Sequence, residues 1–156
     1  MVNIQDIYKM LNWKSSPETQ SEGMDLARKV NDLSLLIQPH AEPSVWERCA
    51  EVLSEKSDDI LEPYLYSLLD WLYDLNWPGA LTILERLKVF SGKKLKKPFI
   101  AYYSMCVSNL NNEYGETQLE YLSELLDNEE LKEELPNEIV EDLKKYYHAS
   151  ELCDDE

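Results

Sequence analysis

Apolar residues return every three or four positions along most of the chain, and this spacing restricts the fold more than any other feature of the sequence. It is visible over residues 4–11 and is densest over residues 60–72. Such spacing places apolar side chains on one face of an α-helix. The chain contains only four glycines and no alternating run of Val, Ile and Thr that would indicate a β-strand. We therefore expect an all-α protein.

Serine and proline residues indicate where several helices begin. Ser16-Pro17 and Ser57-Asp58 are typical starts, because serine accepts hydrogen bonds from unpaired amides and proline has no amide to satisfy in a first turn. The periodic segments predict helices over residues 4–11, 17–33, 43–53, 58–72, 77–89, 95–110, 116–127, 129–134 and 137–147.

Two prolines suggest an internal repeat. Pro63 and Pro98 lie 35 residues apart, each near the expected start of an apolar helix. A helix, a short turn and a second antiparallel helix form the unit of HEAT-type repeats.

We expect one helical domain over residues 1–156, either a short HEAT-like α-solenoid or an irregular bundle of antiparallel helix pairs. Residues 26–110 would form the repeat core, and residues 113–156 acidic C-terminal helices. The expected core residues are Leu65, Leu68, Leu69, Leu72, Ile83, Leu84, Leu87, Tyr102 and Met105.

The chain is strongly acidic, with a formal net charge of −16. Residues 113–156 hold 16 acidic and 3 basic residues. This charge repels nucleic acid and anionic lipid, and it attracts a basic protein over long range. It also keeps a small protein soluble, so charge alone does not identify a partner. We interpret the lysines of residues 93–97 as a counter-charge to the acidic C-terminal helices, and we expect neither nucleic-acid nor membrane binding.

The residues needed for common enzymatic chemistry are missing. The two histidines, His40 and His148, are distant from each other in the sequence and lack metal-ligand spacing to other residues. There is no CxxC, HExxH, nucleophile elbow, P-loop or dinucleotide fingerprint. We expect no enzyme, metal or cofactor.

Of the three cysteines, Cys49 and Cys106 are expected to be core residues. The odd number of cysteines argues against disulfide bonds, and the sequence shows neither a leader segment nor an apolar span. These features predict a cytoplasmic protein.

The segment Trp71-Leu72-Tyr73-Asp74-Leu75-Asn76-Trp77-Pro78-Gly79-Ala80 concentrates aromatic and turn residues. We expect Asn76 to cap a helix that begins at Trp77, with Pro78 in its first turn and Gly79 permitting close helix packing. The alternative is a partner contact made by Trp71, Tyr73 and Asp74.

This segment, preceded by Leu61-Glu62-Pro63, resembles the W-x-x-D-x-N-W-P-x-A signature of a small bacterial family of HEAT-like proteins. The resemblance covers about residues 26–110. Members of that family are often encoded beside polymorphic or contact-dependent toxins and are candidate immunity proteins. The resemblance implies an immunity protein that binds a basic toxin domain, such as a nuclease, and occludes its active site or substrate cleft. The alternative is a non-enzymatic helical-repeat adaptor in an intracellular complex.

Exposed carboxylates would steer a basic partner toward the protein, and aromatic side chains would anchor it. Tyr66 is a further candidate anchor. The residues expected to bind the partner are Asp70, Tyr73, Asp74, Trp77, Tyr114, Glu120, Tyr121, Glu124, Asp127, Glu130 and Glu134.

Overall fold

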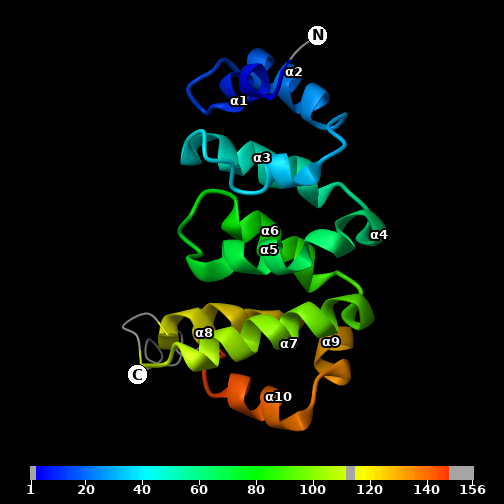
Figure 1. The fold of residues 1–156 in the computed structure, drawn as a ribbon, viewed down its shortest axis with the longest axis vertical. Coiled ribbons are helices and arrows are strands. Elements are labelled where there is room, and N and C mark those ends of the chain that lie inside the picture. The colour runs from blue at the N-terminus through cyan, green and yellow to red at the C-terminus, as the bar shows by residue number, and fades with distance from the viewer. Residues whose placement is uncertain (1–2, 112–114, 148–156) are drawn as a thin grey trace.

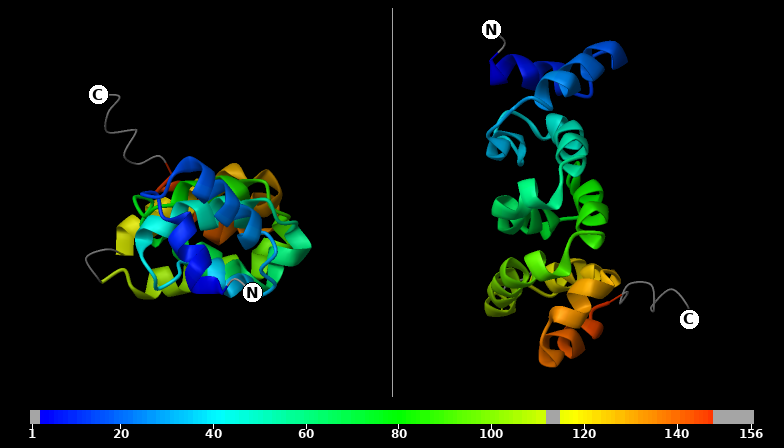
Figure 2. Two further views of the ribbon diagram at one scale, coloured as in Figure 1. Left: turned by 90° about the horizontal axis from the view of Figure 1, so that it is seen from above. Right: turned by 90° about the vertical axis from the view of Figure 1, so that its right-hand side faces the viewer.

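The computed structural model describes residues 3–111 and 115–147, and within these ranges it contains helices and no β-strand. The all-α prediction is confirmed. The helices form a stack in which the N-terminal pair lies at one end and the C-terminal helices at the other (Figure 1). The right-hand view of Figure 2 shows two segments side by side in the second and middle layers, one at the left and one at the right of the picture.

The stack begins with α1 (Ile4–Leu11) and α2 (Pro17–Ala27), which pack against each other. The next layer contains η1 (Leu33–Leu36), η2 (Pro43–Val45) and α3 (Trp46–Ser54). The middle layer contains α4 (Asp58–Leu61), η3 (Glu62–Tyr64), α5 (Leu65–Asp70), η4 (Trp71–Tyr73) and α6 (Ala80–Lys88). The C-terminal layers contain α7 (Gly92–Ser108), α8 (Gly115–Ser123), η5 (Glu124–Asp127), α9 (Glu129–Glu134) and α10 (Asn137–Lys144).

The two serine helix starts are confirmed. Ser16 Oγ accepts a hydrogen bond from the Thr19 amide at 3.2 Å, and Ser57 Oγ accepts one from the Ile60 amide at 3.3 Å. Both bonds satisfy an amide that has no partner inside its own helix. However, α2 ends at Ala27, so the expected continuation to residue 33 is wrong.

The single helix expected over residues 58–72 is divided into four short segments. Pro63 lies in the first turn of η3, where its missing amide breaks the α-helical hydrogen-bond pattern. Pro98 instead lies well inside α7, a helix of 17 residues. The two prolines therefore occupy different places in their helices, and the repeat unit inferred from their spacing is not reproduced at this position.

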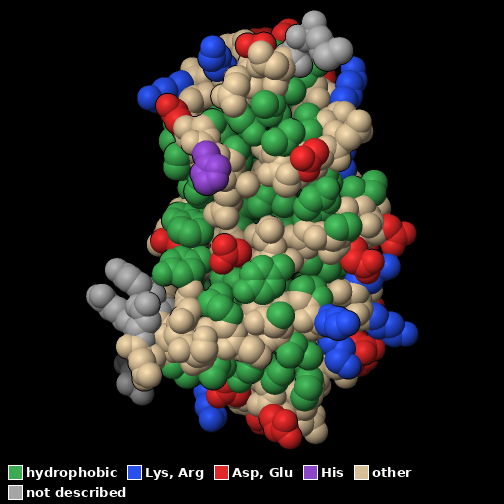
Figure 3. Space-filling model, in the orientation of Figure 1, with side chains coloured by type: hydrophobic (Ala, Val, Ile, Leu, Met, Phe, Trp, Pro, Cys, Tyr) green, Lys and Arg blue, Asp and Glu red, His purple; other side chains and the backbone are tan. Residues whose placement is uncertain are grey.

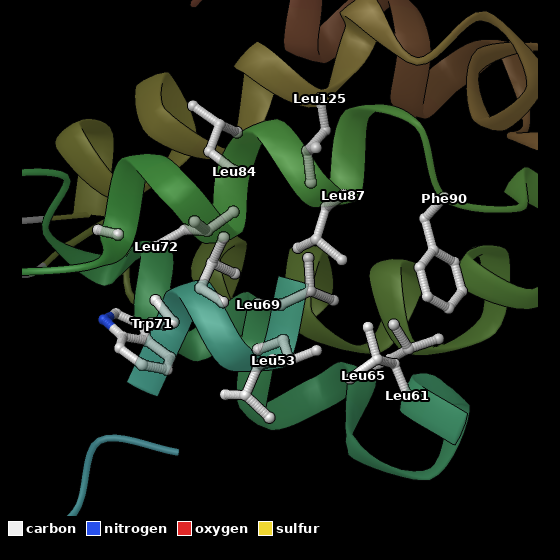
Figure 4. Packing of buried hydrophobic residues seen from close by; sticks show 14 of the residues in the cluster. Leu53, Leu61, Leu65, Leu69, Trp71, Leu72, Leu84, Leu87, Phe90 and Leu125 are labelled. Atoms are coloured by element: carbon white, nitrogen blue, oxygen red, sulfur yellow. The ribbon is translucent and has the colours of Figure 1, made fainter. Parts of the chain in front are cut away.

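Leucines from most layers meet in one core. Figure 4 shows five leucines of this buried cluster, which are Leu53 of α3, Leu69 of α5, Leu84 and Leu87 of α6 and Leu125 of η5. The expected core residues are buried except for Met105, which is half-buried and packs at the edge of the cluster. Cys49 and Cys106 are buried as expected. Burial raises the pKa of each cysteine thiol to about 12, so both remain protonated at neutral pH.

The beginning of α7 packs closely against the beginning of α9. A Cβ added to Gly92 would lie 2.3 Å from the Leu131 amide nitrogen, so no larger residue fits there without a backbone shift. The carboxylate of Glu130 accepts a hydrogen bond from the Gly92 amide at 2.9 Å. Glycine at this position therefore permits the contact that fixes the acidic C-terminal helices to the rest of the stack.

Several basic side chains are neutralised by nearby carboxylates. Lys94 Nζ lies 3.0 Å from the Asp59 carboxylate and 3.3 Å from that of Glu62. Among the described residues, Lys94 thus pairs with α4 and η3 and not with the acidic C-terminal helices, which corrects our interpretation of this lysine. Lys88 pairs with Asp127 at 3.2 Å.

Candidate partner-binding site

The segment between η4 and α6 is a tight turn held by Asp74. Asp74 Oδ1 accepts a hydrogen bond from the Asn76 amide at 2.8 Å, and the Asp74 carbonyl accepts one from the Trp77 amide at 3.0 Å. The helix begins at Ala80, with Gly79 as its N-cap residue, so the prediction that Asn76 caps a helix starting at Trp77 is wrong. Trp77 precedes Pro78, and helical backbone angles are unfavourable for a residue that precedes a proline. A helix is therefore not expected to begin at Trp77.

Gly79 meets both a conformational and a packing requirement. Its φ angle of +84° lies in the left-handed region, which residues with a Cβ rarely adopt. A Cβ at this position would lie 2.8 Å from the Ala50 Cβ and 2.9 Å from Cζ2 of Trp71. The expected close packing is therefore confirmed. The Gly79 amide also donates to Oε2 of Glu47 at 2.8 Å, which connects the start of α6 to α3.

Four aromatic side chains form a cluster beneath the turn. Trp46 makes edge contacts with Trp71, at a centroid distance of 6.2 Å, and with Trp77, at 5.9 Å. Tyr73 stacks on Trp77 with centroids 5.5 Å apart and ring planes 15° from parallel. Trp71 is fully buried, and its Nε1 donates to the Pro78 carbonyl at 3.0 Å. Trp71 is therefore a core residue, while Tyr73 and Trp77 are half-buried and reach the surface.

A groove of about 380 Å³ lies beside this cluster. Its lining residues are Tyr73, Asp74 and Asn76 from η4 and the turn, and Thr117 and Tyr121 from α8. α8 packs directly against η4, which brings these two parts of the chain together. The loop that leaves η4 projects at the left of Figure 1, on the same side as the beginning of α8. We call this feature the η4–α8 groove.

The η4–α8 groove carries uncompensated negative charge. Within the described residues, Asp74 forms no ion pair with Lys or Arg, and its Oδ2 atom has no hydrogen-bond partner. Burial raises the pKa of Tyr121, and the charges of Asp74 and Glu120 raise it further. The Tyr121 hydroxyl is therefore neutral at physiological pH and lies within the electric field of both carboxylates.

The other predicted contact residues are distributed over several elements. Asp70 accepts a hydrogen bond from the Tyr102 hydroxyl at 3.3 Å, and Asp127 accepts one from the Tyr147 hydroxyl. These two hydrogen bonds stabilise the fold, as do the Lys88–Asp127 ion pair and the hydrogen bond of Glu130 to α7. The pattern of acidic residues in the sequence therefore does not separate carboxylates that bind a partner from carboxylates that stabilise the fold. Glu124 lies on η5 and Glu134 on α9, both half-buried, and Tyr114 lies outside the described residues. A partner contact by any of these residues stays a prediction.

The structure thus unites Tyr73, Asp74 and Tyr121, with Glu120 close to Tyr121. Asn76 and Thr117 also line the groove, and the sequence alone does not predict this role for either. No local pattern identifies Thr117, because its place in the groove depends on the packing of α8 against η4.

The face shown in Figure 3 carries hydrophobic side chains across its middle, with acidic side chains scattered among them. Basic side chains gather at its right-hand edge, where α7 begins. Tyr66 lies on α5 with 45% of its surface exposed, and its ring makes an edge contact with the Tyr102 ring at a centroid distance of 5.5 Å. This face is therefore mixed and not uniformly acidic.

Neither metal-binding clusters nor membrane-spanning helices are found in residues 3–111 and 115–147. No three His, Cys, Asp or Glu side chains there are grouped so that they could hold a metal ion. No helix in these ranges combines the length and apolar character required to cross a bilayer.

The chain belongs to a protein family described as a domain of unknown function (DUF5071), whose model matches residues 47–152. The match begins in α3 and includes α6 and α7. It also contains both walls of the η4–α8 groove. No curated protein and no solved structure matches the chain.

Proposed function

We propose that the protein is a non-enzymatic immunity protein that binds a basic toxin domain in the cytoplasm and occludes its active site or substrate cleft. The main support is the η4–α8 groove, which is lined by two tyrosines and by an Asp74 carboxylate that forms no ion pair within the described residues, on a protein of net charge −16. Residues 71–80 resemble the signature of candidate immunity proteins, and this resemblance is the reason for proposing a toxin as the partner.

The acidic surface and the groove would act at different stages of binding. Long-range attraction between exposed carboxylates and a basic toxin increases the association rate. Once the two proteins touch, half-buried aromatic side chains such as Tyr73 and Tyr121 exclude water and slow dissociation. A stable interface buries about 800 Å² on each partner, so the surface around the groove must also contribute.

A nuclease is the toxin class that best suits this charge. Nucleases hold phosphate groups in cationic clefts, and a carboxylate-rich protein presents charge of the same sign as the phosphate backbone. Binding over such a cleft would block the substrate without any catalytic step by the immunity protein.

Co-expression with a toxin domain encoded beside the gene tests this function. We expect cells to survive toxin expression only when the protein is present, and the two purified proteins to elute as one complex. Asp74→Arg should abolish protection, because it reverses the charge in the groove. Glu133→Arg is the matched control, since it reverses an exposed charge on α9, away from the groove-lining residues.

Failure of the wild-type protein both to protect cells and to bind the toxin would contradict the immunity role. That result would favour the alternative, a helical-repeat adaptor for a partner that is not toxic.

A further inference from the structure

We propose that the η4–α8 groove receives an arginine side chain of the partner, with the guanidinium beside Asp74 and between the side chains of Tyr73 and Tyr121. This inference rests on the proposed function insofar as the partner is a basic protein. It goes further by naming the side chain that enters the groove and the residues that bind it.

The size of the groove suits one extended side chain. Its volume of about 380 Å³ and its five lining residues leave no room for a helix or a folded loop of the partner. A single arginine side chain projecting from the partner surface enters such a space without filling it, and the surrounding partner surface then closes around its base.

The polar atoms of the groove match a guanidinium better than other charged groups. Arginine offers five N–H donors and no acceptor. Asp74 offers a charged acceptor at Oδ2, and the oxygens of Tyr121 and Thr117 are further acceptors. Because Oδ1 is already bound to the Asn76 amide at 2.8 Å, the Asp74 carboxylate is held in place before the ligand arrives.

The aromatic side chains favour arginine over lysine. Tyr73 is held by stacking on Trp77, and Trp77 contacts Trp46, so the ring loses little further freedom when a ligand binds. A planar, weakly hydrated guanidinium stacks on such a ring, whereas the compact ammonium of lysine keeps its hydration shell. The field of Asp74 and Glu120 at the Tyr121 hydroxyl adds attraction for either cation.

Amide shifts in an NMR titration test the side-chain preference directly. The probes are N-acetyl-arginine amide and N-acetyl-lysine amide at equal ionic strength. We expect the arginine probe to shift the amides of Asn76, Thr117 and Tyr121, and the lysine probe to produce shifts several-fold smaller. Equal shifts for both probes would overturn the inference, as would shifts confined to other residues or no shift with either probe.

Asp74→Asn supplies the matched variant for this titration. Asparagine retains the oxygen that accepts the Asn76 amide, so the turn is preserved while the charge is removed. The arginine shifts should disappear in this variant. They should persist in Glu133→Gln, which removes an exposed charge that does not line the groove. Persistence in Asp74→Asn would overturn the inference.

The toxin complex separates this inference from the proposed function. Asp74→Asn and Tyr121→Ala should each weaken the complex roughly tenfold or more, mainly through faster dissociation. Trp13→Ala is the aromatic control, because Trp13 is 55% exposed in the turn between α1 and α2. If the wild type binds the toxin and the groove variants bind equally well, the arginine site is wrong and the immunity role stands. If the arginine probe binds but the toxin does not, the immunity role is wrong and the groove remains an arginine site.

Discussion

Asn128 joins the end of α6 to the start of α9, and its replacement by alanine should strongly destabilise the protein. The side chain is only 3% exposed. Its Nδ2 donates to the carbonyls of Leu87 and Phe90, each at 2.9 Å, and its Oδ1 accepts from the Leu131 amide at 3.0 Å. Asn128→Ala removes all three hydrogen bonds at once.

The expected loss of unfolding free energy depends on which hydrogen-bond partners each backbone group keeps after Asn128 is replaced. Loss of the helix cap at the Leu131 amide costs about 1 kcal/mol. The buried Phe90 carbonyl loses its partner, which costs about 1 to 3 kcal/mol. The Leu87 carbonyl still accepts from the Phe90 amide at 3.2 Å, so its loss is smaller. We therefore expect the free energy of unfolding to fall by about 2 to 4 kcal/mol.

Urea unfolding followed by far-UV circular dichroism measures this change. Asn3→Ala is the control, because Asn3 caps α1 at an exposed end through a bond of 3.0 Å from the Asp6 amide. The control should lose only about 0.5 to 1 kcal/mol. If Asn128→Ala is no more destabilising than Asn3→Ala, our reasoning about the buried carbonyls is wrong.

Three further predictions concern the core, the turn and the response to pH. Leu68→Ala should lower the free energy of unfolding by about 2 to 5 kcal/mol in urea unfolding, because Leu68 is buried; a loss below about 1 kcal/mol would contradict this. Gly79→Ala should cost at least about 2 kcal/mol and lower the Tm, since it combines left-handed backbone strain with a collision at Ala50, and an unchanged Tm would refute it. Burial and then Asp70 raise the pKa of Tyr102 above its usual 10.0, so the unfolded chain loses this proton first and stability falls as pH rises above about 10. Tyr102→Phe should make this fall shallower, and an identical pH dependence in both proteins would contradict the assignment.

The sequence predicts most helices because the determinants of a helix are local. The apolar period predicts the bounds of α1 and the end of α6 with little error, and the serine at position 57 predicts the start of α4. The sequence does not predict the break after Leu61, because the apolar pattern continues through Pro63 without interruption, although the proline removes a backbone donor.

The turn before α6 shows where local reasoning fails. Asn76 is a favoured helix-capping residue, yet Asp74 two positions earlier holds the turn, and the positive φ of Gly79 delays the helix. The choice depends on the packing of Gly79 against Ala50 of α3, a contact between residues far apart in the sequence.

The candidate site is likewise only partly predictable. Tyr73 and Asp74 stand out because they belong to an unusual aromatic turn, and Tyr121 because it lies in an acidic helix. Their meeting in one groove depends on the packing of α8 against η4, which no sequence spacing reveals. For the same reason, the sequence does not predict the bond between Glu130 and the Gly92 amide, and it indicates only a partner-binding carboxylate at Glu130.

The association rate with the basic toxin domain, measured at low and at high salt, tests electrostatic capture at the acidic groove most directly. Ions screen exposed charges beyond about 8 Å at physiological ionic strength, so the rate should fall steeply as salt is added. Charge reversal by Glu120→Lys should lower the rate at low salt and weaken its salt dependence, because Glu120 lies close to the groove residue Tyr121. An association rate that responds neither to salt nor to this charge reversal would contradict electrostatic capture at the groove.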